Sequence, residues 1–491
     1  MADIIKPEDR ADYKSLAYRE MSVFWAKTQA LYDGADATKR QGFLKQMEAD
    51  SKAGRKAYEN RKDEAELYGI FKSQIQSVVG EVFNGDIVPT NPPALLAPFF
   101  KDADLCGNDF QSVLREAFVG AVRDGLSYVY VDAPKAVESE SGNTSLRDVQ
   151  DRRPYLIHYE ASQLVNWATE IVNGVVVLTR ATLREMSIEP YGKFGEKRVE
   201  RYKVLEKTSE GVVYSVWRVD NETEGKPLIL EDDAISIGLD EIPLVPVYGF
   251  KKAPFVTIPP FMSVAEANLK HFNKLSMLDY ILTFIKPKIV TKFDTLDDAK
   301  QFDISTMAVD AGIKIYGENA DVKYLELKGD SIPELRIEIE NVEKRISTLT
   351  MAKFAPIQDG SIKTATEVVT GKKEEMSEVA VMAQNLENAG DTIIDFVIAQ
   401  FKNIRSEATV NVKRNEDLAF KIDYDRLTFS LDQMRYISEQ VDSGRLSNTT
   451  FYEMLGRFLD MPKDWKPEDE PARIAQDRGQ DFQTQVAELE I

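Results

Sequence analysis

The chain is poor in the side chains on which thiol and metal chemistry depend. Its 491 residues include one cysteine, Cys106, and two histidines, His158 and His271. A single cysteine excludes an intramolecular disulfide and a cysteine-rich zinc site, and two histidines exclude a multi-histidine metal centre. Such a protein needs no oxidising compartment. We therefore expect neither a metal nor any other cofactor.

Long apolar runs are missing as well. The longest, such as residues 242–250, are short and contain proline, whereas a membrane-spanning helix needs about 20 apolar residues. The first ten residues are charged and lack the apolar region of a signal peptide. The sequence therefore predicts a soluble, non-secreted protein with no membrane partner.

Positive charge is in deficit. Lys and Arg total 62 against 82 for Asp and Glu, which gives a formal net charge of −20. Overall charge therefore cannot hold the chain on DNA or on anionic lipid, and any contact with nucleic acid has to be local or weak. With 43% hydrophobic residues and a length that allows about three domains of ~150 residues, the chain can bury a sizeable core.

The usual catalytic motifs are absent. The sequence has no phosphate-binding P-loop, dinucleotide-binding glycine motif, nucleophile elbow or zinc-protease helix. Cys106 stands among aspartates with no histidine nearby, so an unreactive loop cysteine is the simpler interpretation. Pairs of carboxylates are common, as chance predicts for 82 acidic residues. The sequence predicts no enzyme; a hydrolase that uses a carboxylate pair is a less favoured alternative.

What is present is a mixture of helical and strand patterns. Apolar spacing and cap residues predict helices in the first 85 residues, including one at 61–83, and another at 109–125 that leads into a strand at 126–131. A polar surface loop is expected at 134–153. Short β-rich segments separated by turn residues then predict strands at 175–182, 199–206, 212–219 and 234–237.

Helical patterns dominate the second half. The predicted helices are 263–285, capped by Ser263 with Glu266 in the capping-box position, one from Pro333 to about 352, one at 364–403, and two near the C-terminus at 430–442 and 448–459. An insertion at 288–330 carries strand patterns at 288–292 and 312–316 around a short helix near 296–302. The fold class is therefore α+β and mainly helical.

Two of these helices carry nearly heptad apolar stripes. Their members are Leu335, Ile339, Val342, Ile346 and Leu349 in one, and Val379, Met382, Leu386, Ala389, Ile393 and Phe396 in the other. A stripe does not by itself indicate oligomerisation. Ordinary helix packing within one chain is the simplest interpretation.

Several strings, in order, resemble a family. They are YENR at 58–61, DADLCGNDFQSVLREAFVGAVRDGLSYVYVDAP at 102–134, RPYLIHYEASQLVNW at 153–167, PPFMSVAEANLKHF at 259–272, TATE at 364–367, DYDRLTFS at 423–430 and GRLSNTTFYEML at 444–455. Together they resemble a subfamily of portal proteins, the head-to-tail connectors of tailed bacteriophages, over residues 55 to 475. The chain departs from that subfamily at Leu105-Cys106-Gly107, where a glycine-rich turn is usual.

The resemblance implies a homo-oligomeric ring of about twelve subunits at one vertex of the capsid. Its partners would be double-stranded DNA bound without sequence preference, the terminase large subunit, a tail adaptor protein, the major capsid protein and the scaffold. The ring would be made in the host cytoplasm and end in the virion. The implied divisions are a wing at 1–260, stem helix 1 at 261–286, a clip at 287–331, stem helix 2 at 332–352, a tunnel loop at 353–363, the long wing helix with a return strand at 364–425, and a crown with the C-terminal tail at 426–491.

The same resemblance suggests site residues. Pro356 and Gly360 interrupt the helical pattern where portal proteins place the tunnel loop, so Lys353, Gln358 and Lys363 would face DNA in the channel. Glu334, Glu338, Glu340 and Glu343 of stem helix 2 are candidates for an acidic channel wall; they could equally face a neighbouring subunit or solvent. The alternative from another class is a monomeric helical scaffold or adaptor of the virion.

Overall fold

The structure is a computed structural model of the 491-residue chain. It describes residues 6–48, 50–84, 87, 92–134, 152–221, 223, 226–285, 288–292, 297, 321–325, 332–350 and 365–405, and the single positions 438, 441, 447, 451, 466, 468–470 and 473. Two compact units are present, Met1–Phe420 and Lys421–Ile491. Nearly all described residues belong to the first unit.

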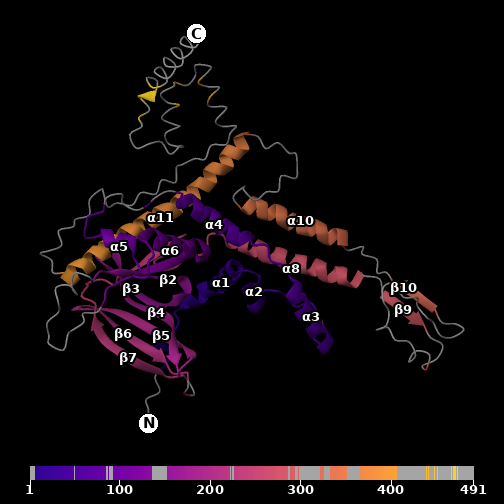
Figure 1. Ribbon diagram of the computed structural model, residues 1–491, viewed down its shortest axis with the longest axis horizontal. Helices are drawn as coiled ribbons and strands as arrows, with labels where there is room; N and C mark the ends of the chain where they lie inside the picture. Colours follow the sequence, from indigo (N-terminus) through magenta and orange to yellow (C-terminus); the bar gives the residue numbers. More distant parts are fainter. Residues whose placement is uncertain are drawn as a thin grey trace, which may run out of the picture. The chain divides into compact units, whose positions relative to one another are not determined.

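The first unit begins with helices, continues with the strands of two antiparallel sheets, and ends with long helices and one further pair of strands (Figure 1). The α-helices are α1 (Leu16–Asp33), α2 (Ala35–Arg40), α3 (Lys52–Glu64), α4 (Ile70–Val82), α5 (Ala97–Lys101), α6 (Phe110–Asp124), α8 (Met262–Ile285), α10 (Ile332–Leu349) and α11 (Ala365–Arg405). Two short 3-10 helices are η1 (Pro7–Asp9) and η2 (Ala161–Gln163).

Within the described residues the strands form three antiparallel sheets, with the orders β2-β1-β8, β3-β4-β5-β6-β7 and β10-β9. Their bounds are β1 (Leu126–Asp132), β2 (Tyr155–Glu160), β3 (Leu164–Val172), β4 (Val175–Tyr191), β5 (Gly195–Thr208), β6 (Gly211–Val219), β7 (Leu228–Ser236), β8 (Leu244–Tyr248), β9 (Lys288–Lys292) and β10 (Asp321–Leu325). The α+β class is confirmed within these residues. Strands take a larger share than the prediction of a mainly helical chain implied.

The predicted helix–strand unit after residue 108 is confirmed. The Asp109 side chain accepts a hydrogen bond from the Ser112 amide at 2.7 Å and so begins α6. Gly125 ends it with a left-handed backbone (φ 90°), where a Cβ atom would lie only 2.5 Å from Thr257 Oγ1. Glycine is required here because any other residue would be strained at this φ and its Cβ atom would collide with Thr257.

The prediction of one helix over 61–83 is wrong. Helix α3 ends at Glu64 and α4 begins at Ile70. Between them Ala65 is buried with Leu44 and Phe272. The carbonyl of Tyr68 and the amide of Phe71 are bound by Asn268 of α8. Tertiary hydrogen bonds therefore replace the helical ones, and sequence periodicity does not reveal them.

One large core cluster lies where α1 meets the two larger sheets. Tyr18, Met21 and Trp25 of α1 pack with Tyr128 and Tyr130 of β1, and the cluster extends through buried residues of β2 to β6 and β8. The indole of Trp25 donates to the Asp124 carbonyl at 3.1 Å. The N-terminal helix and the strand-rich half are therefore one packed body.

Helix α11 covers this body. Its residues Val379, Met382, Leu386, Ala389 and Ile393 are buried, and Phe396 is partly buried. The helix contacts α4, α6, β1 and β8 of its own chain. The interpretation of this stripe as ordinary packing within one chain is confirmed.

A buried ion pair joins α3 to the segment before it, and its arginine also reaches α8. Arg61 Nε lies 2.7 Å from Glu48 Oε1, and the two side chains are 3% and 1% exposed. Arg61 also donates to Ser276 Oγ of α8 at 3.0 Å. Burial of Glu48 disfavours its charge, but the hydrogen bonds from Arg61 and from backbone amides outweigh burial, so the pKa of Glu48 is lowered. This contribution to stability is present at neutral pH and is lost as the pH falls through the lowered pKa.

We expect Glu48→Gln to lower the free energy of unfolding by about 3–5 kcal/mol, because it leaves a buried guanidinium without its partner. The matched control is Asp50→Asn, which removes a carboxylate from the exposed Arg55–Asp50 pair and costs less than about 1 kcal/mol. Urea denaturation at pH 7 measures both. Equal losses in the two variants would contradict this account.

Candidate functional site

Helices α8 and α10 form an antiparallel pair. Ala267 of α8 packs with Val342 and Ile346 of α10, all nearly buried. Further along α8, Lys274 contacts Glu338, which lies earlier in α10. Later residues of one helix thus meet earlier residues of the other, and Figure 1 shows the two side by side. The apolar stripe predicted for the second of these helices is the surface that packs on α8.

The chain between the two helices contains β9 and β10, which are antiparallel partners separated by residues 293–320 in the sequence and are here together named the β9–β10 hairpin. Lys288 pairs with Leu325 and Lys292 with Asp321. The strand predicted at 288–292 is confirmed. The strand predicted at 312–316 lies outside the described residues, and of the predicted short helix near 296–302 only residue 297 is described, in helical conformation. Strand β10 was not predicted.

Two asparagines of α8 form hydrogen bonds to backbone groups in the N-terminal helical region. Asn268 Oδ1 accepts a hydrogen bond from the Phe71 amide at 3.1 Å, and its Nδ2 donates to the Tyr68 carbonyl at 3.0 Å. Because Phe71 is in the first turn of α4 and the preceding Gly69 has no side chain to cap it, Asn268 supplies the missing acceptor. This role was not predicted, because an asparagine within a helical pattern carries no local sign of the partners that it contacts in the folded chain.

Asn273, one and a half turns later, makes the equivalent contact with another segment. Its Oδ1 accepts from the Lys45 amide at 2.8 Å and its Nδ2 donates to the Phe43 carbonyl at 3.0 Å. Residues 43–45 lead from α2 toward α3, so α8 is fixed to two successive connections of the N-terminal helices.

The polar contacts between α8 and α10 involve carboxylates of α10. His271, 1% exposed, has Nε2 3.1 Å from Glu343 Oε1, and its ring lies 5.1 Å from the ring of Tyr68. Lys274 is hydrogen-bonded to Glu338. That hydrogen bond and the ammonium charge lower the pKa of Glu338. Glu343 and Glu338 therefore help to fix the register of the pair.

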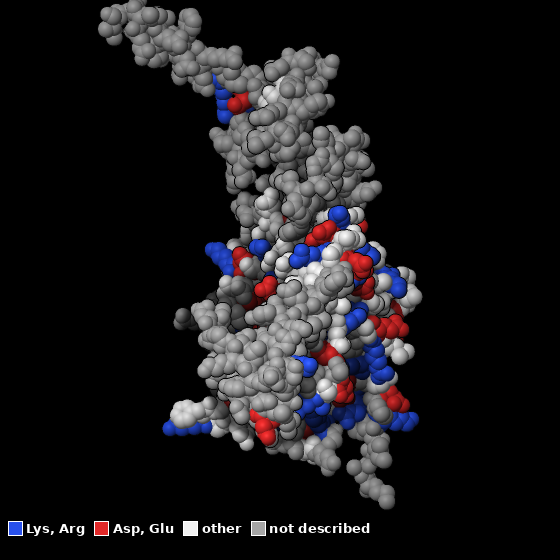
Figure 2. All heavy atoms as spheres, turned by 90° about the vertical axis from the view of Figure 1, so that its right-hand side faces the viewer, with Lys and Arg blue, Asp and Glu red and all other residues white. Residues whose placement is uncertain are grey.

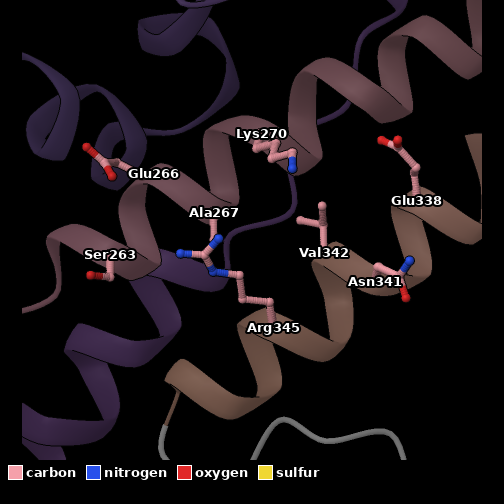
Figure 3. Close-up of a pocket in the computed structure, with 8 residues that line it drawn as sticks. All are labelled: Ser263, Glu266, Ala267, Lys270, Glu338, Asn341, Val342 and Arg345. Atoms are coloured by element: carbon pink, nitrogen blue, oxygen red, sulfur yellow. The ribbon is translucent and has the colours of Figure 1, made fainter.

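A groove of about 500 Å³ runs between the two helices (Figure 3). Its lining is contributed by α8 and α10: Ser263, Glu266, Ala267, Lys270, Glu338, Asn341, Val342 and Arg345. In Figure 3 the Arg345 side chain extends from α10 toward α8. Among the described residues, neither Lys270 nor Arg345 forms an ion pair. Ser263, predicted as the N-cap, lies instead inside α8, which begins at Met262.

The predicted channel-wall residues differ in their surroundings. All four are exposed, but Glu338 and Glu343 also contact α8. The predicted tunnel-loop residues Lys353, Gln358 and Lys363 lie outside the described residues. Both assignments stay predictions.

Charge on the exposed surface is mixed in sign. Figure 2 shows basic and acidic side chains interspersed on the face that it presents. Within the described ranges, no three or more His, Cys, Asp or Glu side chains are grouped as a metal site requires, and no helix there is long and apolar enough to cross a membrane. Cys106 is exposed, and His158 Nδ1 lies 3.5 Å from Glu116.

Comparison with known proteins gives distant likenesses. A family described as a domain of unknown function (DUF4055) matches residues 260–401, the segment from α8 into α11. No curated protein matches.

Among solved structures, the chain is similar to the neck of an empty GTA particle computed with C6 symmetry, with 11% identity, 79% of this chain and 90% of that chain covered, and a TM-score of 0.41. It is also similar to the neck of a native GTA particle computed with C12 symmetry, with 10% identity, 79% and 89% covered, and a TM-score of 0.36. These likenesses are too distant to carry an argument about this chain.

We expect Ile346→Ala to lower the free energy of unfolding by about 2–5 kcal/mol, because it opens a cavity between α8 and α10. Ile337 is the matched control, since it lies about two and a half turns earlier, on the opposite side of the same helix, and is 55% exposed. Ile337→Ala should change stability by less than about 0.5 kcal/mol. Urea denaturation compares the two, and a control as destabilised as Ile346→Ala would argue against the α8–α10 packing.

Proposed function

We propose that this chain is a portal protein of a tailed bacteriophage, a structural ring subunit with no catalytic activity. The observation that carries the proposal is the antiparallel α8–α10 pair with the β9–β10 hairpin in its connection. A ring around a channel needs each copy to bring a slender, stiff element to the axis, and a helix pair joined through a hairpin is such an element. The ordered strings that resemble portal proteins flank and include it.

In this proposal α8 and α10 are the paired stem helices of residues 261–286 and 332–352, and the hairpin belongs to the clip of residues 287–331. Residues 1–260 with α11 make the wing. The segment 353–363 is the tunnel loop, and residues 426–491 are the crown and tail. The clip would meet the terminase large subunit during packaging and the tail adaptor afterwards. The wing would meet the major capsid protein and scaffold at the capsid vertex of the virion.

The excess of acidic over basic residues has a physical use in such a ring. Twelve copies would carry 12 × (−20) = −240 formal charges. An acidic wall repels the phosphate backbone, so that DNA slides without adhering, while a few lysines make weak, salt-sensitive contacts. Glu334 and Glu340, which are exposed on α10, are better candidates for this wall than Glu338 and Glu343. The last two are engaged with α8.

The mass of the purified protein in solution tests the proposal. One chain has a mass of 55.5 kDa, so a ring of twelve would have a mass of 12 × 55.5 = 666 kDa. We expect light scattering to give a mass close to this multiple and negative-stain images to show a central hole. A 55.5 kDa particle at every concentration, and also with scaffold protein added, would favour the monomeric scaffold or adaptor instead.

The tunnel-loop assignment predicts a separate effect. Lys353→Ala combined with Lys363→Ala should leave ring assembly intact and shorten or destabilise the packaged genome, because two belts of phosphate contacts are removed. Genome length in purified particles, measured by pulsed-field electrophoresis, provides the test. The matched control replaces Lys344 by alanine on the exposed surface of α10. Unchanged genome length in the double variant would contradict the assignment.

A further inference from the structure

The five-stranded sheet carries two protruding hairpins, one at each end of β4. Strand β3 pairs with β4 from Leu183 to Val175, while β5 pairs with it from Arg180 to Tyr191. At one end, therefore, residues 169–178 form a two-stranded ribbon of β3 and β4, here named ribbon A. At the other end, residues 184–200 form a two-stranded ribbon of β4 and β5, here named ribbon B.

Both ribbons expose large apolar side chains. Ribbon A has Ile171 at 77% and Val175 at 64% exposed, with Val172 and Val176 beside them. Ribbon B has Phe194 at 90% and Tyr191 at 62% exposed, with Met186 and Ile188 on the same hairpin. An isolated two-stranded hairpin is at best marginally stable in water. Exposed β-branched and aromatic residues concentrated at its end therefore indicate a surface that another molecule covers.

The two ribbons differ in charge. The end of ribbon B carries Lys193, Lys197 and Arg198 with one acid, Glu196, while residues 170–177 of ribbon A carry only Glu170. The ammonium of Lys193 lies 5.1 Å from the Phe194 ring centroid, and that of Lys197 lies 5.7 Å from the Tyr191 ring. The tip of ribbon B, residues 191–198, is thus basic and aromatic, whereas basic and acidic side chains balance over residues 184–200 as a whole. The basic tip of ribbon B and the single acid of ribbon A, Glu170, are opposite in charge, so like-charge repulsion does not oppose a contact between them.

The placement of the ribbons determines the kind of contact. From Val175 to Tyr191, β4 spans 16 residue steps, or about 53 Å at ~3.3 Å per residue. Ribbons A and B of one chain therefore cannot meet. When the A ribbon of one copy contacts the B ribbon of another, each copy keeps one free ribbon. Further copies can then add head to tail until a ring closes.

We propose that ribbon B of each subunit docks on ribbon A of the next subunit, as part of the contact between neighbours. This inference rests on the proposed function, because it assigns a subunit interface within the proposed ring. A second copy of the chain is the partner that supplies both surfaces in equal number.

Cysteine cross-linking tests the pairing. In a Cys106→Ser background, Val175→Cys with Phe194→Cys places one thiol on each ribbon of the assembled protein. A short bis-maleimide should then give a ladder of covalent dimers, trimers and larger species, while either cysteine alone gives uncross-linked chain. The control pairs Phe194→Cys with Leu16→Cys, which is 73% exposed on α1, and should give no ladder. Phe194→Glu should weaken association of subunits about tenfold or more, as loss of an interface anchor does.

The outcomes separate the two proposals. A ladder from the double variant alone supports the ribbon contact. Dimers from a single-cysteine variant would overturn it, because they mean that like ribbons meet about a two-fold axis. Rings seen by electron microscopy without a ladder would overturn the ribbon contact and leave the portal proposal standing. A wild-type chain that stays monomeric and gives no ladder would overturn both.

Discussion

Helix α8 has to pack on two sides at once, and the rest of the described structure depends on how it does so. Toward the body it presents Asn268, Phe272 and Ser276, which contact α4, the 43–45 connection and Arg61. Toward α10 it presents Ala267, which is small enough for a close approach, and His271. A helix with such a polar and small-residue surface has little apolar contrast between its faces. It is ordered by specific partners more than by amphipathicity.

This double role couples the N-terminal helices to the α8–α10 pair. The Asn268 side chain caps α4, and the buried Arg61–Glu48 pair anchors α3 and its preceding loop to Ser276. A displacement of α8 would leave several buried polar groups without partners, each at a cost of about 1–3 kcal/mol. The pair is therefore rigidly anchored to the rest of its own chain, as the proposed stem of a portal ring requires.

Sequence patterns predicted the elements whose signals are local. Asp109 and Gly125 mark the ends of α6. The strands predicted at 175–182, 199–206 and 212–219 lie within β4, β5 and β6, although β4 and β5 are longer than predicted. The break between α3 and α4 was missed, because Asn268, about 200 positions away, supplies the hydrogen bonds that replace the helical ones. Strand β10 was missed as well. Val322 and Tyr324 alternate with Asp321 and Lys323, but the run is only five residues long and is defined by its pairing with β9.

The polar residues of α8 and α10 likewise include contacts that could be predicted from the sequence and contacts that could not. Their number is plain from the sequence, and residues next to an apolar stripe commonly pair with the facing helix. Glu338 and Glu343 stand directly beside Ile339 and Val342 of that stripe, so their contacts with Lys274 and His271 were open to prediction. The positions of Lys270 and Arg345 in the groove could not be predicted in this way, because only the register of the two helices brings these residues together.

The most direct test of the account is an electron cryo-microscopy reconstruction of the assembled protein. The account predicts a closed ring in which the α8–α10 pair of every subunit surrounds the central channel and the β9–β10 hairpin lies at one end of it. Contradiction would come from an assembly in which α8 and α10 separate, or in which the pair lies at the outer rim away from the channel.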